Sequence, residues 1–389
     1  VLSNQGFPPQ CTILSEPTMK LRMHTAAALL AALLAAPLAT GADLTASMSE
    51  GKPDLKSIGP IAFGPEGILF AADSKSAAVF AIATGDTKGV QADSLKVENL
   101  DEKIAALLGT SVEQILVSDL AVNPASGTPY LAVSRGRGPD ANPVLLKVNG
   151  DGSLALVSLD KVKFSLAALP NAPADKVVGQ GRRRKNARLE SITDIAYTNG
   201  DVIVAGLSNE EFASSLRRIP FPFKEVGKGT SVEIFHGAHG KLETRSPVRT
   251  FTTITIENEP HLLAAYTCTP LVQFPLKSLK PGAKIRGTTL AELGNRNRPL
   301  DMIVYQQGKQ TFILIANNAR GIMKVTTKDI TEAKGISKRV EGGKTEGLSY
   351  QTIESWKGVE QLNGYNSESA IVVQRGDPGG LSLTTMPLP

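Results

Sequence analysis

The sequence predicts an all-β protein, a six-bladed β-propeller, from three observations. A phrase of three apolar runs separated by short turns returns six times. The second run of each copy is apolar on both faces, as in VIVAG (202–206) and FILIA (312–316), which is typical of a strand covered on both sides. Helical periodicity is weak, and only LDEKIAALLG (100–109) predicts a helix, with Gly109 as its stop. A repeat built only from short strands indicates propeller blades.

The first run of each copy is expected to form the innermost strand of its blade. These runs are PIAF (60–63), SDLAVN (118–123), TDIAYT (193–198), TTITIE (252–257), LDMIVY (300–305) and EGLSYQ (346–351). The last copy reaches Pro389 without a fourth strand, so we expect DLTASM (43–48) to complete that blade and close the ring. Seven or eight blades would follow instead if 161–188 or 352–366 held additional strands.

The N-terminal residues have the features of a processing segment. Met19 opens a basic stretch, AAALLAALLAAPLA (26–39) is apolar, and 40–42 are small residues, so 19–42 is predicted to be a signal peptide and 1–18 to lie upstream of the true start. The apolar stretch is shorter than the roughly 20 residues of a membrane span. We therefore expect 43–389 to be one propeller domain, periplasmic or secreted, with neither a membrane span nor a lipid anchor.

The composition of 43–389 limits its partners. Cys268 is its only cysteine, so no internal disulfide is possible. Without 1–42 the formal charge falls from +5 to +4, and the basic loop at 182–188 alone supplies more than that. The rest is close to neutral, which excludes a surface that coats nucleic acid. We expect a monomer.

Two segments resemble known propeller families. GPIAFGPEGILFAAD (59–73) resembles the repeats of NHL-type and gluconolactonase-like propellers, and KTEGLSY (344–350) is similar to the opening phrase of phytase-like esterase propellers. The resemblance implies a propeller fold, and it raises the possibility of a divalent-metal-dependent hydrolase of lactones or phosphate esters.

Acidic residues recur at one position of the innermost runs. Asp119, Asp194 and Asp301 occupy it in three copies, and Glu346 lies one residue before it in the sixth. A ring would gather them around the mouth of the central channel, where oxygen-only ligands suit Ca²⁺ or Mg²⁺. The alternative is that each carboxyl caps its strand by accepting backbone N–H groups, with Arg298 a candidate to neutralise Asp301.

Loops from second to third strands share one end of a propeller with the starts of the innermost strands, and this end is the expected binding face. Its polar, partly cationic rim could hold a small anion, a glycan or an acidic partner protein. The predicted ligand-binding residues are Arg135, Arg137, Asn209, Glu211, Asn318 and Arg375. The basic loop GQGRRRKNAR (179–188) leads into the same end, or is simply solvated.

Histidine is scarce in 43–389, and no serine-hydrolase motif is present. His236-x-x-His239 would bind a metal ion only with a third ligand, and we recognise none with suitable spacing, so zinc is not predicted. A structural or envelope-assembly role stays open, and beside it there are two more specific hypotheses. The first is an exported, non-catalytic propeller that binds a ligand at the channel mouth. The second is a metal-dependent hydrolase that uses Asp119, Asp194, Asp301 and Glu346.

Overall fold

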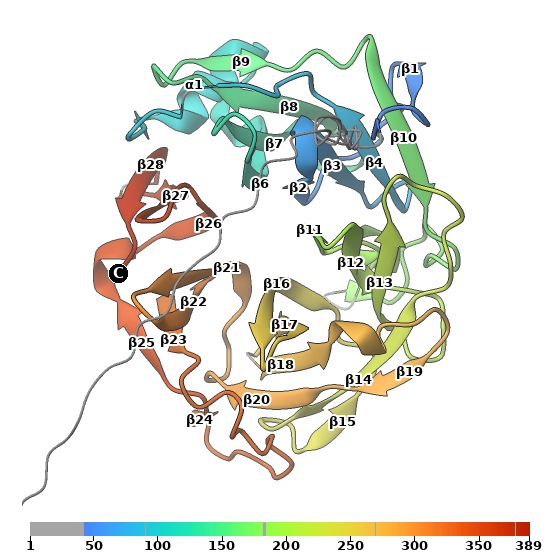
Figure 1. Cartoon of the computed structure of the whole chain (residues 1–389), viewed down its shortest axis with the longest axis vertical. Coiled ribbons are helices and arrows are strands. Elements are labelled where there is room, and N and C mark those ends of the chain that lie inside the picture. Colours follow the sequence, from blue (N-terminus) through green and yellow to red (C-terminus); the bar gives the residue numbers. More distant parts are fainter. Residues whose placement is uncertain (1–42, 90, 182–183, 269, 378) are drawn as a thin grey trace, which may run out of the picture. The chain divides into compact units, whose positions relative to one another are not determined.

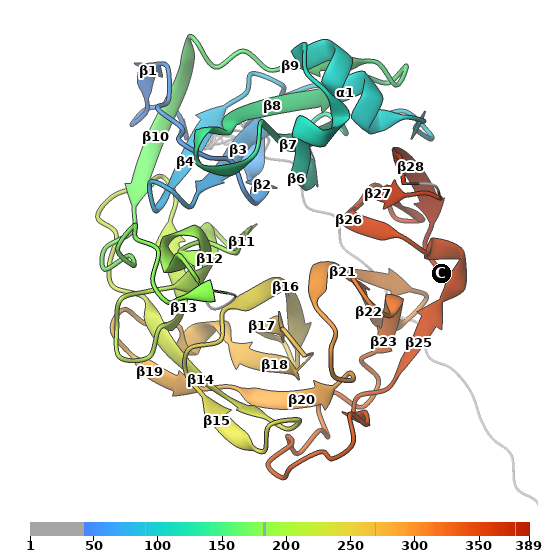
Figure 2. The same ribbon diagram turned by 180° about the vertical axis from the view of Figure 1, so that it is seen from behind.

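The computed structural model describes residues 43–389 except 90, 182–183, 269 and 378. The predicted signal peptide and upstream segment lie outside the described residues, as do two arginines of the basic loop. Residues 44–389 form one compact unit. Six sheets of mainly antiparallel strands surround a central channel (Figures 1 and 2), so the predicted six-bladed β-propeller is confirmed.

The blades are numbered by the chain order of their innermost strands, and the strands of each blade follow one another from the channel outward. Blade 1 contains β2 (Ile61–Phe63), β3 (Ile68–Asp73), β4 (Ala78–Ala83), β10 (Val162–Ala168) and β1 (Ser49–Gly51). Blade 2 contains β6 (Ile115–Val122), β7 (Pro129–Arg135), β8 (Asn142–Val148) and β9 (Leu154–Leu156). Blade 3 contains β11 (Asp194–Thr198), β12 (Asp201–Leu207), β13 (Ser214–Pro220), β14 (Thr230–His236) and β15 (Lys241–Glu243), and β19 (Lys284–Arg286) pairs with β14.

The remaining blades follow the same plan. Blade 4 contains β16 (Val248–Ile256), β17 (Glu259–Tyr266), β18 (Pro270–Pro275), β20 (Thr288–Glu292) and β24 (Glu346–Gly347). Blade 5 contains β21 (Pro299–Gln307), β22 (Gln310–Asn317), β23 (Gly321–Thr326) and β25 (Tyr350–Ile353). Blade 6 contains β26 (Val359–Gly364), β27 (Ser369–Arg375), β28 (Leu381–Pro387) and β5 (Lys96–Val97).

The second strand of each blade is its most buried element, as the sequence predicts. Every residue of β3 and β12 is buried, because a blade packs between two neighbours and both faces of its sheet are covered. Six apolar clusters fill the six interfaces between neighbouring blades. The ring is therefore held mainly by apolar burial between sheets.

The order of blades around the ring differs from their order in the chain. Blade 2 packs between blade 1 and blade 6, and blade 1 packs between blade 2 and blade 3. Figure 1 shows the teal strands of blade 2 between the blue strands of blade 1 and the red strands of blade 6. After β9 the chain returns to blade 1 through β10, which pairs with β4. The ring order is thus 2, 1, 3, 4, 5, 6.

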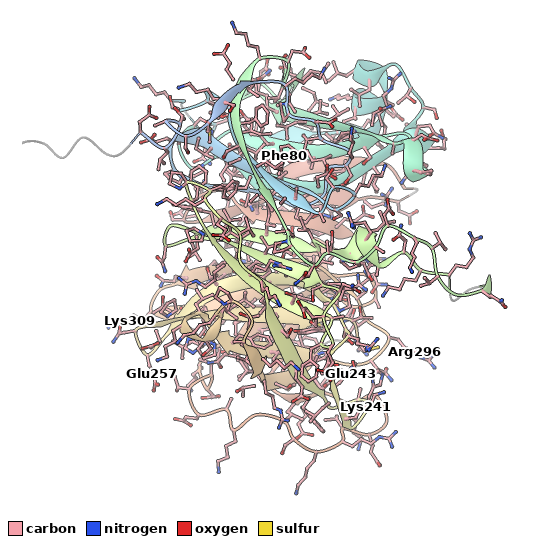
Figure 3. The ribbon with its side chains drawn as sticks, turned by 90° about the vertical axis from the view of Figure 1, so that its right-hand side faces the viewer. Phe80, Lys241, Glu243, Glu257, Arg296 and Lys309 are labelled. Carbon is pink, nitrogen blue, oxygen red and sulfur yellow. The ribbon has the colours of Figure 1, made fainter. Side chains whose placement is uncertain are left out.

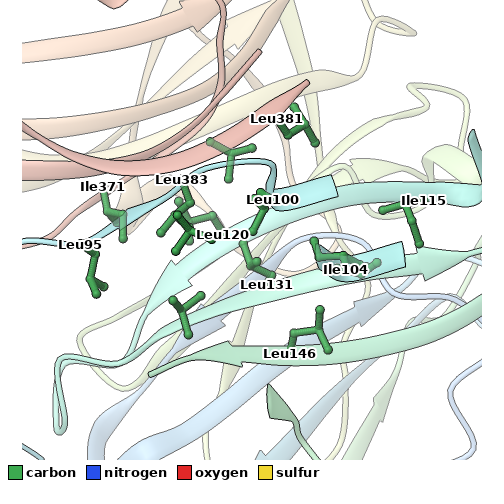
Figure 4. Close-up of a cluster of buried hydrophobic side chains, with 14 of the residues drawn as sticks. Leu95, Leu100, Ile104, Ile115, Leu120, Leu131, Leu146, Ile371, Leu381 and Leu383 are labelled. Carbon is green, nitrogen blue, oxygen red and sulfur yellow. The ribbon is translucent and has the colours of Figure 1, made fainter. Parts of the chain in front are cut away.

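A segment from the N-terminal part of the chain completes blade 6, but it is not the segment that we expected. β5 pairs with β28, whereas residues 44–47 form a turn and β1 pairs with β10 at the outer edge of blade 1. The segment that connects β4 of blade 1 to β6 of blade 2 runs along blade 6 and contributes β5 to it. Helix α1 (Leu100–Leu108), confirmed with Gly109 as its C-cap, follows β5 and packs its Leu100 and Ile104 into the interface between blades 2 and 6 (Figure 4).

The sixth innermost strand also differs from the prediction. EGLSYQ (346–351) supplies β24 at the outer edge of blade 4 and the start of β25, the fourth strand of blade 5. The innermost strand of blade 6 is β26, within the segment 352–366 that was suspected of hiding strands. That segment completes the sixth blade and adds no seventh. Two of its aromatic residues, Trp356 and Tyr365, are buried.

Candidate functional site

The central channel contains a cavity of about 620 Å³ lined by innermost strands. Its lining residues include apolar ones such as Ile61, Phe251 and Met302, although polar atoms provide more of the wall than apolar atoms do. Three carboxyl groups, those of Asp119, Asp194 and Asp301, line the same cavity. The ring therefore brings together residues that are far apart in the sequence.

Glu346 does not join these aspartates, and its predicted place at the channel is wrong. It lies in β24, where it pairs with Glu292 at the outer edge of blade 4, and it is exposed. The misplacement follows from the wrong assignment of the sixth innermost strand. The residue beside the aspartates in blade 6 is Gln361 of β26. With its amide oriented to donate, the Gln361 nitrogen lies 3.3 Å from both Asp301 Oδ2 and Asp119 Oδ1.

The three aspartates repeat one hydrogen-bond pattern. One oxygen accepts the N–H of the next residue in the same strand: Leu120, Ile195 and Met302, at 2.8, 2.8 and 2.7 Å. The other oxygen accepts an N–H from the innermost strand of a neighbouring blade: Ile61, Phe251 and Leu362, at 2.6, 2.7 and 2.7 Å. Each carboxyl thus joins two blades, and the pairs are blades 2 and 1, 3 and 4, and 5 and 6.

The pairing explains why only alternate blades carry an aspartate. In the ring order, blades 2, 3 and 5 each bind the following blade, so three carboxyls link six blades in pairs. The expected capping role of these aspartates is present, and it extends across the blade boundary. We call the three side chains the channel carboxyls.

Burial perturbs the titration of the channel carboxyls. The side chains keep some accessible surface because they face the cavity, but protein surrounds that cavity, so their charged forms are poorly solvated. Desolvation raises the pKa of Asp119 to about 8 and that of Asp194 to about 7, against the accepted N–H bonds that lower it. Desolvation and then the charge of Asp119 raise the pKa of Asp301 well above its usual range. The group therefore retains protons near neutral pH.

A second polar group lies where the innermost strands of blades 3, 4 and 5 begin, which we call the mouth end of the channel. Glu190 ends a short 3₁₀ helix (Ala187–Glu190) before β11, Arg249 lies in β16, and Arg298 directly precedes β21. Arg249 Nη2 lies 2.9 Å from Glu190 Oε1, and Lys185 Nζ lies 2.6 Å from Glu190 Oε2. We call Lys185, Glu190, Arg249 and Arg298 the mouth cluster.

Electrostatics within the mouth cluster favour an added negative charge. Burial acts to raise the pKa of Glu190, but Lys185 and Arg249 outweigh it and hold this pKa below its usual value. Desolvation, followed by the charge of Arg249, lowers the pKa of Arg298, while Glu190 opposes the shift. Among the residues that the structure describes, Arg298 makes no ion pair. The cluster thus holds three cationic side chains against one carboxylate, and Arg298 does not neutralise Asp301.

The predicted rim residues lie in several separate places. Asn318 holds the backbone of Arg298, since its Oδ1 accepts the Arg298 N–H at 2.8 Å and its own N–H donates to the Arg298 carbonyl at 3.1 Å. Asn318 and Arg375 line one cleft of about 700 Å³ between blades 5 and 6, although Arg375 is already paired there with Glu360 at 2.6 Å.

The other rim residues are also engaged. Arg137 donates to the carbonyls of Glu113 and Ile115, at 2.8 and 2.6 Å. Arg135 lies 3.4 Å from the Gly109 carbonyl. Glu211 pairs with Lys284 of β19 at 2.6 Å, and the Asn209 N–H donates to the Asn171 carbonyl. The rim is therefore a set of locally satisfied groups, whereas the mouth cluster has an unpaired cation.

Comparisons with known proteins find only distant structural similarities. No family model matches the sequence, and no curated protein matches it. Solved structures that resemble it include the soluble aldose sugar dehydrogenase of Escherichia coli, at 10% identity over 88% of this chain and 99% of the other, with a TM-score of 0.33. The PQQ-bound aldose sugar dehydrogenase of Streptomyces coelicolor matches at 9% identity, over 88% and 98%, with a TM-score of 0.31. The WD40 propeller domain of Doa1 matches at 8% identity, over 87% and 95%, with a TM-score of 0.29.

At such identities and TM-scores these similarities carry no conclusion about family or activity. Among the described residues, no helix has the length and apolar character needed to cross a membrane.

Proposed function

We propose that the protein is an exported, non-catalytic propeller that binds an anionic group at the mouth end of its channel. The observation that carries this proposal is the mouth cluster, in which, among the described residues, Lys185 and Arg249 share the carboxylate of Glu190 and Arg298 makes no ion pair. A carboxylate or phosphate group placed beside Arg298 would complete the charge balance of the cluster and accept charge-assisted hydrogen bonds. A free small anion, an acidic glycan and an acidic protein segment all present such a group.

Asn318 acts in this proposal as a positioning residue rather than as a direct contact, because its side chain binds the Arg298 backbone. The predicted set Arg135, Arg137, Asn209, Glu211 and Arg375 would form the surroundings of the site. Export through the predicted leader at 19–42 and a monomeric state remain part of the same proposal.

Calorimetry with inorganic phosphate and with citrate tests the proposal. We expect the wild-type chain to bind at least one of the two anions, with an affinity that falls as salt is added. Arg298→Gln should lower that affinity at least fivefold. The matched control is Arg286→Gln, because Arg286 lies on β19 and is paired with Glu233 at the outer edge of blade 3. No binding of either anion, or equal affinity in Arg298→Gln, would overturn the proposal.

The alternative, a calcium-dependent lactonase or phosphoesterase, places a cation among the channel carboxyls. Both oxygens of each carboxyl already accept backbone N–H groups, and their raised pKa values favour protons at neutral pH. The raised pKa values and the N–H bonds support the structural role more strongly than the catalytic one. A calcium titration of the chelator-treated chain distinguishes the structural role of the channel carboxyls from the catalytic one.

A further inference from the structure

A hairpin at the outer edge of blade 3 gathers two histidines and a glutamate. β14 ends at His236, the turn contains His239, and β15 ends at Glu243. The strand pairing sets His236 opposite Lys241, and the turn closes with N–H bonds from His239 and Gly240 to the His236 carbonyl, at 3.1 and 2.8 Å. Figure 3 shows Lys241 and Glu243 toward the lower end of the molecule, and their strand β15 lies at the opposite edge of the sheet from the innermost strand β11.

The three side chains converge closely. Glu243 Oε1 lies 2.6 Å from His239 Nδ1, and Glu243 Oε2 lies 3.2 Å from His236 Nδ1. The two imidazole rings lie with centroids 3.9 Å apart. One nitrogen from each ring and one carboxylate oxygen all lie within 4.8 Å of one another. A tetrahedral ion with bonds of about 2.0–2.2 Å needs ligand atoms roughly 3.3–3.6 Å apart, which small side-chain rotations can supply.

The two histidines differ in burial. The His236 side chain is only 4% exposed, and its Nε2 is buried with no hydrogen-bond partner in the described part of the chain. Nε2 points away from the Nδ1 atom that contacts Glu243, so an ion that Glu243 shares would bind on the Nδ1 side of the ring. In contrast, His239 is 47% exposed, so the cluster is open to solvent on one side.

The surroundings favour a dication. Ser246 Oγ donates to Glu243 Oε2 at 2.6 Å and fixes that carboxylate, as outer groups do around metal ligands. Glu292, a buried residue of β20, accepts the Gly237 N–H at 2.6 Å and holds the turn. A Cβ at position 237 would lie 3.0 Å from Glu292 Oε1, so glycine allows this close approach. Two acidic side chains thus lie beside two imidazoles.

We infer that His236, His239 and Glu243 form a site for Zn²⁺ with three protein ligands and a fourth position left to water. Two imidazoles and one carboxylate are the ligand types that zinc takes in open, three-ligand sites. The site is separate from the channel and from the mouth cluster, so it stands independently of the proposed anion-binding function.

Metal titration of the full chain, after treatment with a chelator, tests the inference. We expect calorimetry to show one equivalent of Zn²⁺ bound, and Co²⁺ to develop the visible absorption of a tetrahedral complex at the same stoichiometry. His239→Gln and Glu243→Gln should each lower zinc affinity at least tenfold. His239 is half exposed, so its variant is expected to fold even if a change at buried His236 does not. His261→Gln is the matched control, because His261 lies in β17 of another blade, and it should bind Zn²⁺ like the wild type.

Two results would overturn the inference. One is the absence of stoichiometric zinc binding by the wild-type chain. The other is zinc binding that persists unchanged in both His239→Gln and Glu243→Gln, which would assign the ion to a different place.

Discussion

The channel carboxyls form one cluster of titratable groups, and His236, His239 and Glu243 of the blade 3 hairpin form another. The two clusters differ in how many of their polar side-chain atoms make hydrogen bonds. In the channel, all six carboxylate oxygens accept a backbone N–H. In the hairpin, His236 Nε2 is buried without a partner in the described part of the chain. The satisfied cluster is explained by the fold itself, because it joins blades. The hairpin cluster is not explained in this way, and its two imidazoles and one carboxylate are ligand types that suit a metal ion.

The comparison also shows that convergence of acidic residues is not enough to identify a metal site. The channel carboxyls come from three blades and face one cavity, as a calcium site would require. Their hydrogen bonds instead run to backbone groups, and their surroundings favour protons. The hairpin offers fewer groups, yet these include imidazole nitrogens, which compete far better for zinc than a protonated carboxyl does.

The largest expected effect is on stability, from removing one channel carboxyl. Asp119→Ala leaves the N–H groups of Ile61 and Leu120 without their acceptor, and each orphaned group costs about 1–3 kcal/mol. We expect the urea midpoint to fall accordingly, with an unchanged m value. Asp140→Ala is the control, since Asp140 is exposed in the β7–β8 loop. If both variants unfold at the wild-type midpoint, the carboxyl does not join the blades energetically.

A second effect is the pH dependence of stability. The folded pKa values of Asp119 and Asp194, about 8 and about 7, lie above the value of about 3.9 expected in the unfolded chain. The folded protein therefore binds more protons than the unfolded chain between these limits. The contribution of these groups is fully present below about pH 4 and is lost as pH rises through 7 and 8.

Chemical denaturation at pH 5, 6, 7 and 8 checks this prediction. The free energy of unfolding of the wild type should carry a component that decreases across the series. Asp119→Asn cannot titrate at this position, so its stability should be lower than wild type at pH 5 but fall less steeply with pH. A variant whose slope matches the wild type would show that Asp119 is ionised throughout and that its pKa is not raised.

The sequence was sufficient to predict the blades but not their order. Apolar second runs such as those around Ile203 and Leu314 mark strands that are covered on both faces, so six sheets could be counted. The exchange of blades 1 and 2 depends on long connections, and short strands such as Lys96–Val97 carry no pattern of their own. Glu346 was misplaced for the same reason, because EGLSYQ resembles an innermost run although tertiary pairing makes it an edge.

The sites were predictable to different degrees. The shared repeat position of Asp119, Asp194 and Asp301 was sufficient to predict that they line one cavity. Their hydrogen-bond donors across the blade boundary could not be predicted from residue types, because they are backbone N–H groups. His236 and His239 were noticed, but Glu243 was missed because the third ligand comes four residues on, across a hairpin turn. The spacing H-x-x-H-x-x-x-E was the available signal, since a hairpin folds its two strands against each other.

The smallest expected effect is that of calcium at neutral pH. A cation among the channel carboxyls would have to displace protons from groups with pKa values near 7 and 8 and compete with six N–H bonds. We therefore expect Ca²⁺ at about 1 mM, far above the dissociation constants of sensor sites, to leave the thermal midpoint of the chelator-treated chain unchanged at pH 7. Calcium binding that disappears in Asp194→Ala and Asp301→Ala would instead establish the channel as a metal site. It would also revive the hydrolase alternative, because a bound cation could then activate water and polarise a substrate oxygen in the same cavity.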